Sequence, residues 1–171
     1  LFLILIAGMF FPAQVVPIPI FRLFNTLKLM DKLAAFIIVH VAFGLPICTL
    51  VLTNYFRDVP EELRSAAMIE GCGDWGFLGI IMLPLLKPAI TALVILQFTW
   101  IWNDFLWPLI LIQTESKLTI QMGVMQLRGQ FGLAWGTQAA TCLVATVPTL
   151  VLFFLMQKHF IRGLTMGAIK E

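Results

Sequence analysis

The sequence predicts an all-α protein that crosses a membrane several times, and three observations support this prediction. Hydrophobic residues make up 60% of the 171 residues and charged residues only 12%, against about 45–50% and about 25% in soluble domains. The mean hydropathy is +0.97. The apolar residues also gather in four long stretches. A soluble domain of this length cannot bury so much apolar surface, and a chain so apolar is not disordered. The predicted fold class is therefore a polytopic transmembrane helical bundle.

The four apolar stretches are at residues 1–11, 33–52, 88–107 and 137–156. A helix needs about 20 apolar residues to cross the hydrocarbon core of a bilayer. The first stretch is shorter, and we expect it to be the end of a span whose beginning precedes this sequence. Pro12 ends it, because proline lacks the N–H that a helix interior requires. Pro46 should kink the second span, a distortion that neighbouring helices can accommodate.

A short amphipathic helix is expected at residues 21–32, where apolar residues form a stripe between charged ones. This pattern is typical of a helix lying in the membrane interface. Alternation of the spans puts the loop at residues 53–87 and the carboxy-terminal tail on one side of the membrane. That side holds 6 Lys and Arg residues and the other side holds 5. The positive-inside rule therefore does not decide the orientation.

The polar segment at residues 58–84 is predicted to hold a second short helix, outside the bilayer. Asp58 is expected to cap the start of this helix, with Pro60 in its first turn. The helix should end at Glu70, because Gly71 permits the left-handed backbone of a C-cap. An apolar segment then returns the chain to the membrane. A short helix joined rigidly to two spans in this way can transmit motion from a partner.

The same segment contains a gapped motif: Ser65-Ala66-Ala67, three residues, Gly71, nine residues, and Ile81-Met82-Leu83-Pro84. Its spacing resembles the signature of the permease subunits of ATP-binding-cassette importers, E-A-A, three residues, G, nine residues, I-x-L-P. The most similar group is the carbohydrate-uptake permeases, which include the maltose type. Ser65 stands where the family has a glutamate that helps the loop dock on the ATPase subunit. Glu61 or Glu62, on the same helical face, is the hypothesised substitute.

Three further stretches resemble the same group: F-G-L-P at 43–46, the tryptophan-rich run at 97–109, and R-G-L-T-M-G-A at 162–168. The resemblance covers nearly the whole chain. It implies one transmembrane domain of the importer permease type over residues 1–171, the carboxy-terminal part of a permease whose amino-terminal spans are missing. Residues 58–84 would be its coupling loop. It also implies a multi-pass protein of the cell inner membrane, with the signature loop and the carboxy terminus in the cytoplasm.

The resemblance implies a permease subunit of an ATP-driven importer for a sugar or sugar-like solute, such as an oligosaccharide, a monosaccharide or glycerol phosphate. The implied partners are two ATPase subunits, a second homologous permease, an extracytoplasmic solute-binding protein and the lipid bilayer. The sequence has no G-x-x-x-x-G-K-[ST] motif for nucleotide phosphates, so the chain is not expected to be an enzyme. ATP and Mg would bind the ATPase subunit, and no cofactor is expected in this chain. The net charge of +2 offers no basic field for nucleic acid. A permease for a non-sugar solute is an alternative, and a stand-alone channel or ion-coupled carrier is a more distant one.

The resemblance assigns contact with the ATPase to these residues of the loop: Glu62, Leu63, Ser65, Ala66, Ala67, Ile69, Glu70, Gly71, Leu83 and Pro84. In the third span, the polar and aromatic residues are Gln97, Trp100, Asn103 and Asp104. A carboxylate in a membrane helix usually marks a pathway, so these residues would line a cavity for sugars. Alternatively, they form an interfacial belt and pack helices, since tryptophans favour the interface. His40 is predicted to be packed or hydrogen-bonded, and no metal site is expected.

Overall fold

The computed structural model describes residues 2–10, 12, 14–130 and 135–168, without the side chains of 128–130 and 158–168. Helices account for all the regular structure in these residues, which confirms the all-α fold class. The elements in chain order are α1 (Phe2–Ala7), the 3-10 turn η1 (Gly8–Phe10), α2 (Pro17–Thr26), α3 (Leu33–Arg57), α4 (Glu61–Ile69), α5 (Asp74–Gly76), the π-helical turn η2 (Phe77–Met82), α6 (Leu83–Trp102), α7 (Leu106–Leu111), the 3-10 turn η3 (Glu115–Lys117), α8 (Ile120–Gln130) and α9 (Trp135–Ala168).

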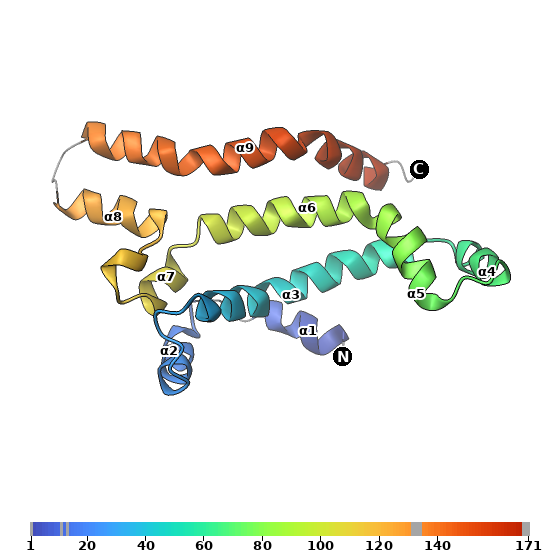
Figure 1. Ribbon diagram of the computed structural model, residues 1–171, viewed down its shortest axis with the longest axis horizontal. Helices are drawn as coiled ribbons and strands as arrows, with labels where there is room; N and C mark the ends of the chain where they lie inside the picture. The colour runs from blue at the N-terminus through green and yellow to red at the C-terminus, as the bar shows by residue number, and fades with distance from the viewer. Residues whose placement is uncertain (1, 11, 13, 131–134, 169–171) are drawn as a thin grey trace.

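Three long helices, α3, α6 and α9, run side by side, with α6 between the other two (Figure 1). Among the described residues, three helical segments are long and apolar enough to cross a membrane: Leu33–Arg57, Asp74–Trp102 and Trp135–Gln157. The 25 residues of α3 extend about 37 Å, which exceeds a hydrocarbon core of about 30 Å. The second, third and fourth predicted spans are therefore confirmed as membrane-length helices. In the first stretch, α1 is six residues long and continues into η1.

The third span differs from its expected bounds at both ends. It begins earlier, because α5 and the π turn η2 continue into α6. Pro84 lies in the first turn of α6, where its missing N–H leaves the carbonyl of Ile80 without the usual α-helical donor, and a π turn accommodates such a gap. The span was expected to reach residue 107, but α6 ends at Trp102. Pro108 explains this end, because its ring would clash with the carbonyl of residue 104 in a continuous helix.

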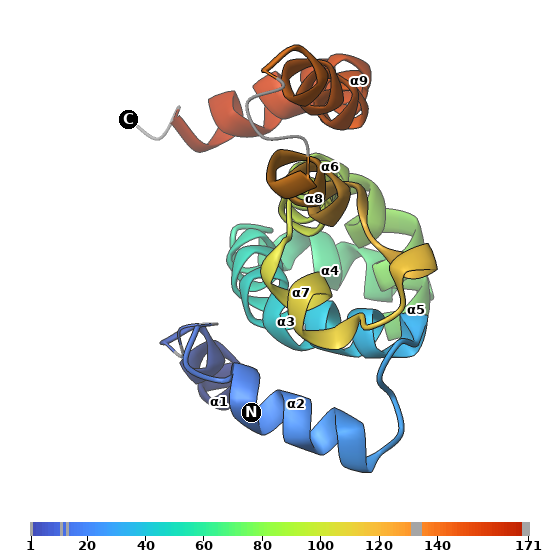
Figure 2. The same cartoon turned by 90° about the vertical axis from the view of Figure 1, so that its left-hand side faces the viewer.

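A short helix is present where the interfacial helix was expected, but the expected bounds of 21–32 were wrong. The helix α2 begins at Pro17, because proline at the first helical position leaves no donor unsatisfied. It ends at Thr26, since Lys28 and Asp31 have positive φ values of 54° and 58°. Seen along the bundle, α2 lies across the end of the long helices (Figure 2), as an interfacial helix would.

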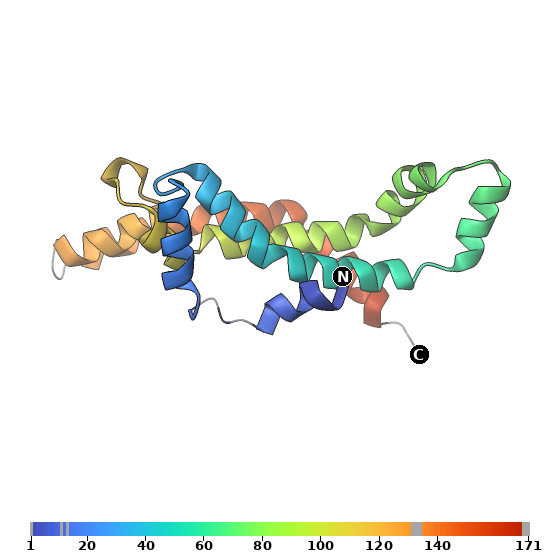
Figure 3. The same ribbon diagram turned by 90° about the horizontal axis from the view of Figure 1, so that it is seen from below.

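The core of the described residues lies at this end of the bundle, where α2, α3 and α7 meet. Its buried side chains are Phe24, Ala35, Val39, Trp107 and Leu111. At the opposite end, α4 lies crosswise to α3 and α6 (Figure 3). The carboxy-terminal end of α9 points to the same end as α4 (Figure 1). The two ends of the bundle thus differ, with the crosswise helix α4 at one and the buried cluster of α2, α3 and α7 at the other.

Candidate functional site

The helix α4 begins two residues later than the sequence suggested. The prediction that Asp58 caps it was wrong, because Asp58 lies at the C-cap of α3 and Pro60 occupies the N-cap of α4. A proline disfavours helical backbone in the residue before it, so the chain cannot continue from Asp58 directly into a helix. Pro60 has an extended backbone, with φ −60° and ψ 136°, and Glu61 and Glu62 occupy the first turn.

The end of α4 forms as predicted. Gly71 has a φ of 82°, in the left-handed region that glycine adopts without strain. The Gly71 amide donates to the Met68 carbonyl at 3.0 Å, and the Cys72 amide donates to the Ala67 carbonyl at 2.9 Å. These two bonds make a Schellman motif, which satisfies carbonyls that would otherwise be left at the helix end. The chain direction after α4 is therefore fixed by backbone hydrogen bonds.

An ion pair between side chains connects α4 to the start of the next helical segment. The Arg64 guanidinium lies 3.2 Å from Asp74 Oδ1 and 3.4 Å from Glu61 Oε1. The hydrogen bond to Asp74, followed by the charge of Glu61, raises the pKa of Arg64 above its ordinary value. Because Glu61 pairs with Arg64, Glu62 is the better placed of the two candidate substitutes for the carboxylate that the motif lacks at Ser65.

Most of the expected ATPase-contacting residues are exposed on α4. Glu62, Leu63, Ser65, Ala66, Ile69 and Glu70 are exposed, whereas Ala67 is buried by the chain itself. Ile69 is 87% exposed and Trp75, in α5, is 85% exposed. Leu83 and Pro84 lie further along, in the first turn of α6. Trp75 was not among the expected site residues, although an indole in a polar loop is itself a signal of an apolar contact.

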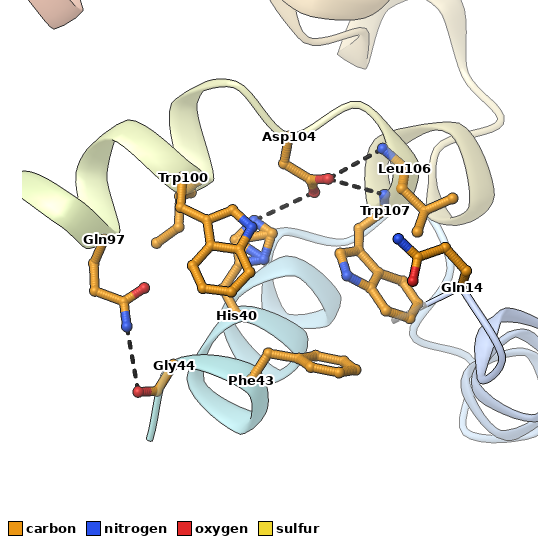
Figure 4. A pocket seen from close by; sticks show the side chains of 10 residues that line it. Gln14, His40, Phe43, Gly44, Gln97, Trp100, Asp104, Leu106 and Trp107 are labelled. Atoms are coloured by element: carbon orange, nitrogen blue, oxygen red, sulfur yellow. Dashed lines mark hydrogen bonds and ion pairs between the residues drawn. The ribbon is translucent and has the colours of Figure 1, made fainter. Parts of the chain in front are cut away.

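A second candidate site is a cavity of about 210 Å³ near the other end of the bundle, lined by Gln14, His40, Phe43, Gly44, Gln97, Trp100, Ile101, Asp104, Leu106 and Trp107. Figure 4 shows that Asp104 and His40 point toward each other across it. Asp104 Oδ1 accepts hydrogen bonds from the amides of Leu106 at 3.0 Å and Trp107 at 3.5 Å, and so caps α7. Asp104 Oδ2 lies 3.5 Å from His40 Nε2.

The structure brings together three of the four expected polar residues of the third span. Gln97 and Trp100 line the cavity with Asp104. Gln97 Nε2 also donates to the Gly44 carbonyl at 3.2 Å, which connects α6 to α3. Asn103 lies elsewhere: it is exposed, and its Nδ2 donates to the Thr99 carbonyl at 2.8 Å. His40 was expected only to pack or hydrogen-bond, and its place opposite Asp104 was missed.

The tryptophans of this region lie in different surroundings. Trp102 Nε1 donates to the Ala145 carbonyl at 2.8 Å and so packs α6 against α9. Trp107 is buried in the core, with its ring centroid 5.4 Å from that of Phe43. Trp100 is largely exposed and lines the cavity. In the part of the chain that the structure describes, no three His, Cys, Asp or Glu residues gather as metal ligands do. The lining of the cavity consists of hydrogen-bonding groups and aromatic and apolar side chains.

Comparisons with known proteins agree with this architecture. Residues 1–166 match the family described as binding-protein-dependent transport system inner membrane component. A probable ABC transporter permease protein of Pyrococcus horikoshii is 37% identical over 163 residues, which are 95% of this chain and 59% of that protein. The arabinooligosaccharides transport system permease protein AraQ of Halalkalibacterium halodurans is 34% identical over 99% of this chain and 60% of its own length.

A third relative is the sulfoquinovosyl glycerol transport system permease protein SmoH of Agrobacterium fabrum, 32% identical over 98% of this chain and 59% of its own length. The chain therefore spans about three fifths of the length of the curated relatives it matches. The family match covers nearly all of the chain, including the motif around α4 and the three membrane-length helices. The chain belongs to the family of inner membrane components of binding-protein-dependent transport systems.

Proposed function

We propose that this chain is part of a permease subunit that imports a sugar or sugar-like solute, driven by ATP that separate subunits hydrolyse. The observation that carries this proposal is α4, a short exposed helix fixed crosswise at one end of the membrane helices. Relatives named for arabinooligosaccharide and sulfoquinovosyl glycerol transport support the solute class. In this proposal residues 1–171 form one transmembrane domain and residues 58–84 are its coupling loop.

The coupling helix α4 seats against an ATPase subunit. Ile69 and Trp75 supply the apolar contact, since both side chains are almost fully exposed. Glu62 supplies the carboxylate that Ser65 lacks. Ala66 and Gly71 have little or no side chain, which allows the partner to approach the backbone closely.

Movement of the ATPase subunit is transmitted from α4 to the membrane helices through the elements that join them. The Schellman motif at Gly71 sets the direction of the chain after α4, and the exposed Arg64–Asp74 ion pair adds a contact between α4 and α5. The helix from α5 through η2 to α6 is continuous, and the 20 residues of α6 alone extend about 30 Å. When ATP closes the ATPase pair, it favours one of two arrangements of the bundle, and the access to the solute pathway changes side.

The proposal also includes the other subunits of an importer. Two ATPase subunits bind ATP and Mg in the cytoplasm, on the side of α4 and of the carboxy-terminal end of α9. A second homologous permease completes the pathway, and an extracytoplasmic solute-binding protein delivers the solute at the opposite end. This chain itself hydrolyses no ATP in this scheme and holds no cofactor.

Site-specific cross-linking in the complete transporter tests the proposal. Ile69→Cys, with the native cysteines replaced, should be captured by a cysteine cross-linker on the ATPase subunit, because Ile69 is 87% exposed on α4. Leu109→Cys is the matched control, since Leu109 is an exposed apolar residue at the other end of the bundle. Capture at position 69 and not at 109 is expected. An assembly that imports sugar while position 69 never captures the ATPase would contradict the proposal.

A further inference from the structure

The cavity at the far end from α4 contains a carboxylate oxygen without a hydrogen bond. Asp104 Oδ2 is buried, and no donor among the described residues forms a hydrogen bond with it. The side chains of Asp104 and His40 are only 12% and 14% exposed. A buried polar atom is normally satisfied, because leaving it without a partner is costly. Among the described residues, Asp104 Oδ2 therefore lacks the donor that a buried carboxylate oxygen normally has.

The cap of α7 does not use Asp104 Oδ2. The cap uses Oδ1 alone, which accepts from the amides of Leu106 and Trp107. An asparagine would supply the same acceptor with its single carbonyl oxygen. The second oxygen accepts no hydrogen bond from the described residues, and its ion pair with His40 holds the carboxylate beside the cavity (Figure 4).

The rest of the lining indicates what kind of molecule supplies the donor. Trp100, Trp107 and Phe43 contribute aromatic surface, while Gln97 and Gln14 contribute amide groups. Apolar and aromatic walls with a few polar groups are typical of small-molecule sites. Aromatic faces pack against the C–H faces of sugar rings, while carboxylates and amides bind their hydroxyls. The volume of about 210 Å³ is below the roughly 300–1,000 Å³ of pockets for drug-sized ligands, and suits a single ring.

The charge of the lining residues favours neutral sugars over anionic ones. The lining residues include a carboxylate and no Lys or Arg. A phosphate or sulfonate would meet Asp104 without a dedicated cation, and like charges in a site of low polarity repel strongly. A neutral hydroxyl meets no such repulsion, because it can donate to the carboxylate.

We propose that this cavity is a subsite for one ring of a neutral sugar on its way through the permease, with the Asp104 carboxylate turning to accept a sugar hydroxyl and Trp100 packing against the ring. His40 positions the carboxylate from the opposite helix. This inference rests on the proposed function and narrows it, because it excludes glycerol phosphate and other anionic solutes from this position.

The first measurement asks what the complete transporter imports. Wild-type proteoliposomes with all subunits are tested with arabinotriose, maltotriose and cellobiose as neutral probes, and with glycerol 3-phosphate and sulfoquinovosyl glycerol as anionic probes. Import of a neutral probe is expected. Import of anionic probes alone would overturn the neutral subsite while leaving the importer function intact. Import of none of them would overturn the proposed function as well.

The second measurement is equilibrium binding of the imported neutral sugar to the purified transporter without its binding protein. Asp104→Asn keeps the α7 cap and removes the second oxygen, and His40→Gln removes the positioning group. A hydrogen bond to a charged group corresponds to about a ten- to hundredfold change in affinity, so each variant should bind at least about tenfold more weakly. Glu115→Gln is the matched control, an exposed carboxylate between α7 and α8, and should bind as the wild type does.

A purely structural role for Asp104 predicts a different outcome. It would leave sugar affinity unchanged in Asp104→Asn, since the cap persists, and would affect only Asp104→Ala, through a lower melting temperature. Wild-type affinity in both Asp104→Asn and His40→Gln would therefore overturn the subsite.

Discussion

At the scale of single residues, Gly71 is where the backbone conformation matters most. Its φ of 82° would cost an alanine about 1–2 kcal/mol. Gly71→Ala should therefore weaken the Schellman motif and lower the amount of sugar imported per ATP hydrolysed in proteoliposomes. Gly73→Ala is the control, because Gly73 has a φ of −75° and an added Cβ would meet nothing within 4 Å. Equal coupling in the two variants would count against a fixed α4.

Asp31 is a second residue whose contribution can be measured by itself, because its contribution to local stability depends on pH. Its Oδ1 accepts from the amides of Gln113 at 2.7 Å and Thr114 at 3.0 Å. The hydrogen bond from the Gln113 amide, followed by that from Thr114, holds the pKa of Asp31 below its ordinary value. The pKa of Asp31 is lower in the folded protein than in the unfolded chain. This contact therefore contributes its full stabilisation of the folded protein at pH values above the ordinary pKa of aspartate, and that stabilisation is lost as the pH falls through the pKa of Asp31 in the folded protein.

Hydrogen exchange should report this loss at the amides of Gln113 and Thr114, which should lose protection on acidification below a pH of about 4. Asp31→Asn should remove that pH dependence. Asparagine retains the Oδ1 acceptor and tolerates the positive φ of 58° at this position, so the variant changes the titration and not the turn. The same acid-induced loss in the variant would show that another group is responsible.

At the scale of elements, the boundaries that the sequence predicts correctly are those set locally. Gly71 ends α4 through its own backbone freedom, and the membrane-length helices follow from composition alone. The boundaries that the sequence predicts incorrectly are those at which a nearby proline overrides the signal of the residue expected to set them. Pro60 displaces Asp58 from the cap of α4, and Pro108 ends α6 six residues before its own position. The pair of His40 and Asp104 could not be predicted, because the two residues are far apart in sequence and meet only when α3 and α6 pack.

The packing of α6 against α9 includes one half-buried hydrogen bond that a single substitution can remove. Trp102 Nε1 donates to the Ala145 carbonyl at 2.8 Å, and its ring stacks on Phe98. Trp102→Phe keeps a ring and removes the donor, so unfolding in mixed micelles should require about 0.5–1.5 kcal/mol less free energy. Trp135→Phe, at an exposed position at the start of α9, should leave the free energy of unfolding unchanged. Equal losses in both variants would show that ring size, not this bond, is responsible.

At the scale of the whole molecule, the orientation in the membrane follows from where the ends of the bundle lie. Charge does not decide it, because 6 Lys and Arg residues fall on one side and 5 on the other. The structure instead gathers α4 and the carboxy-terminal end of α9 at one end, and α2, α7 and α8 at the other (Figure 1). If α4 contacts an ATPase, its end must face the cytoplasm and the η3 turn must face outward.

Labelling with a membrane-impermeant maleimide distinguishes the two orientations, in a background from which Cys48, Cys72 and Cys142 have been removed. Lys117→Cys, in η3, should react in intact cells, whereas Ile69→Cys, in α4, should react only after the membrane is permeabilised. Both positions are exposed, so an unreactive cysteine reports its side of the membrane and not burial in this chain. The reverse pattern would place the coupling helix outside the cell, where no nucleotide-driven partner could reach it.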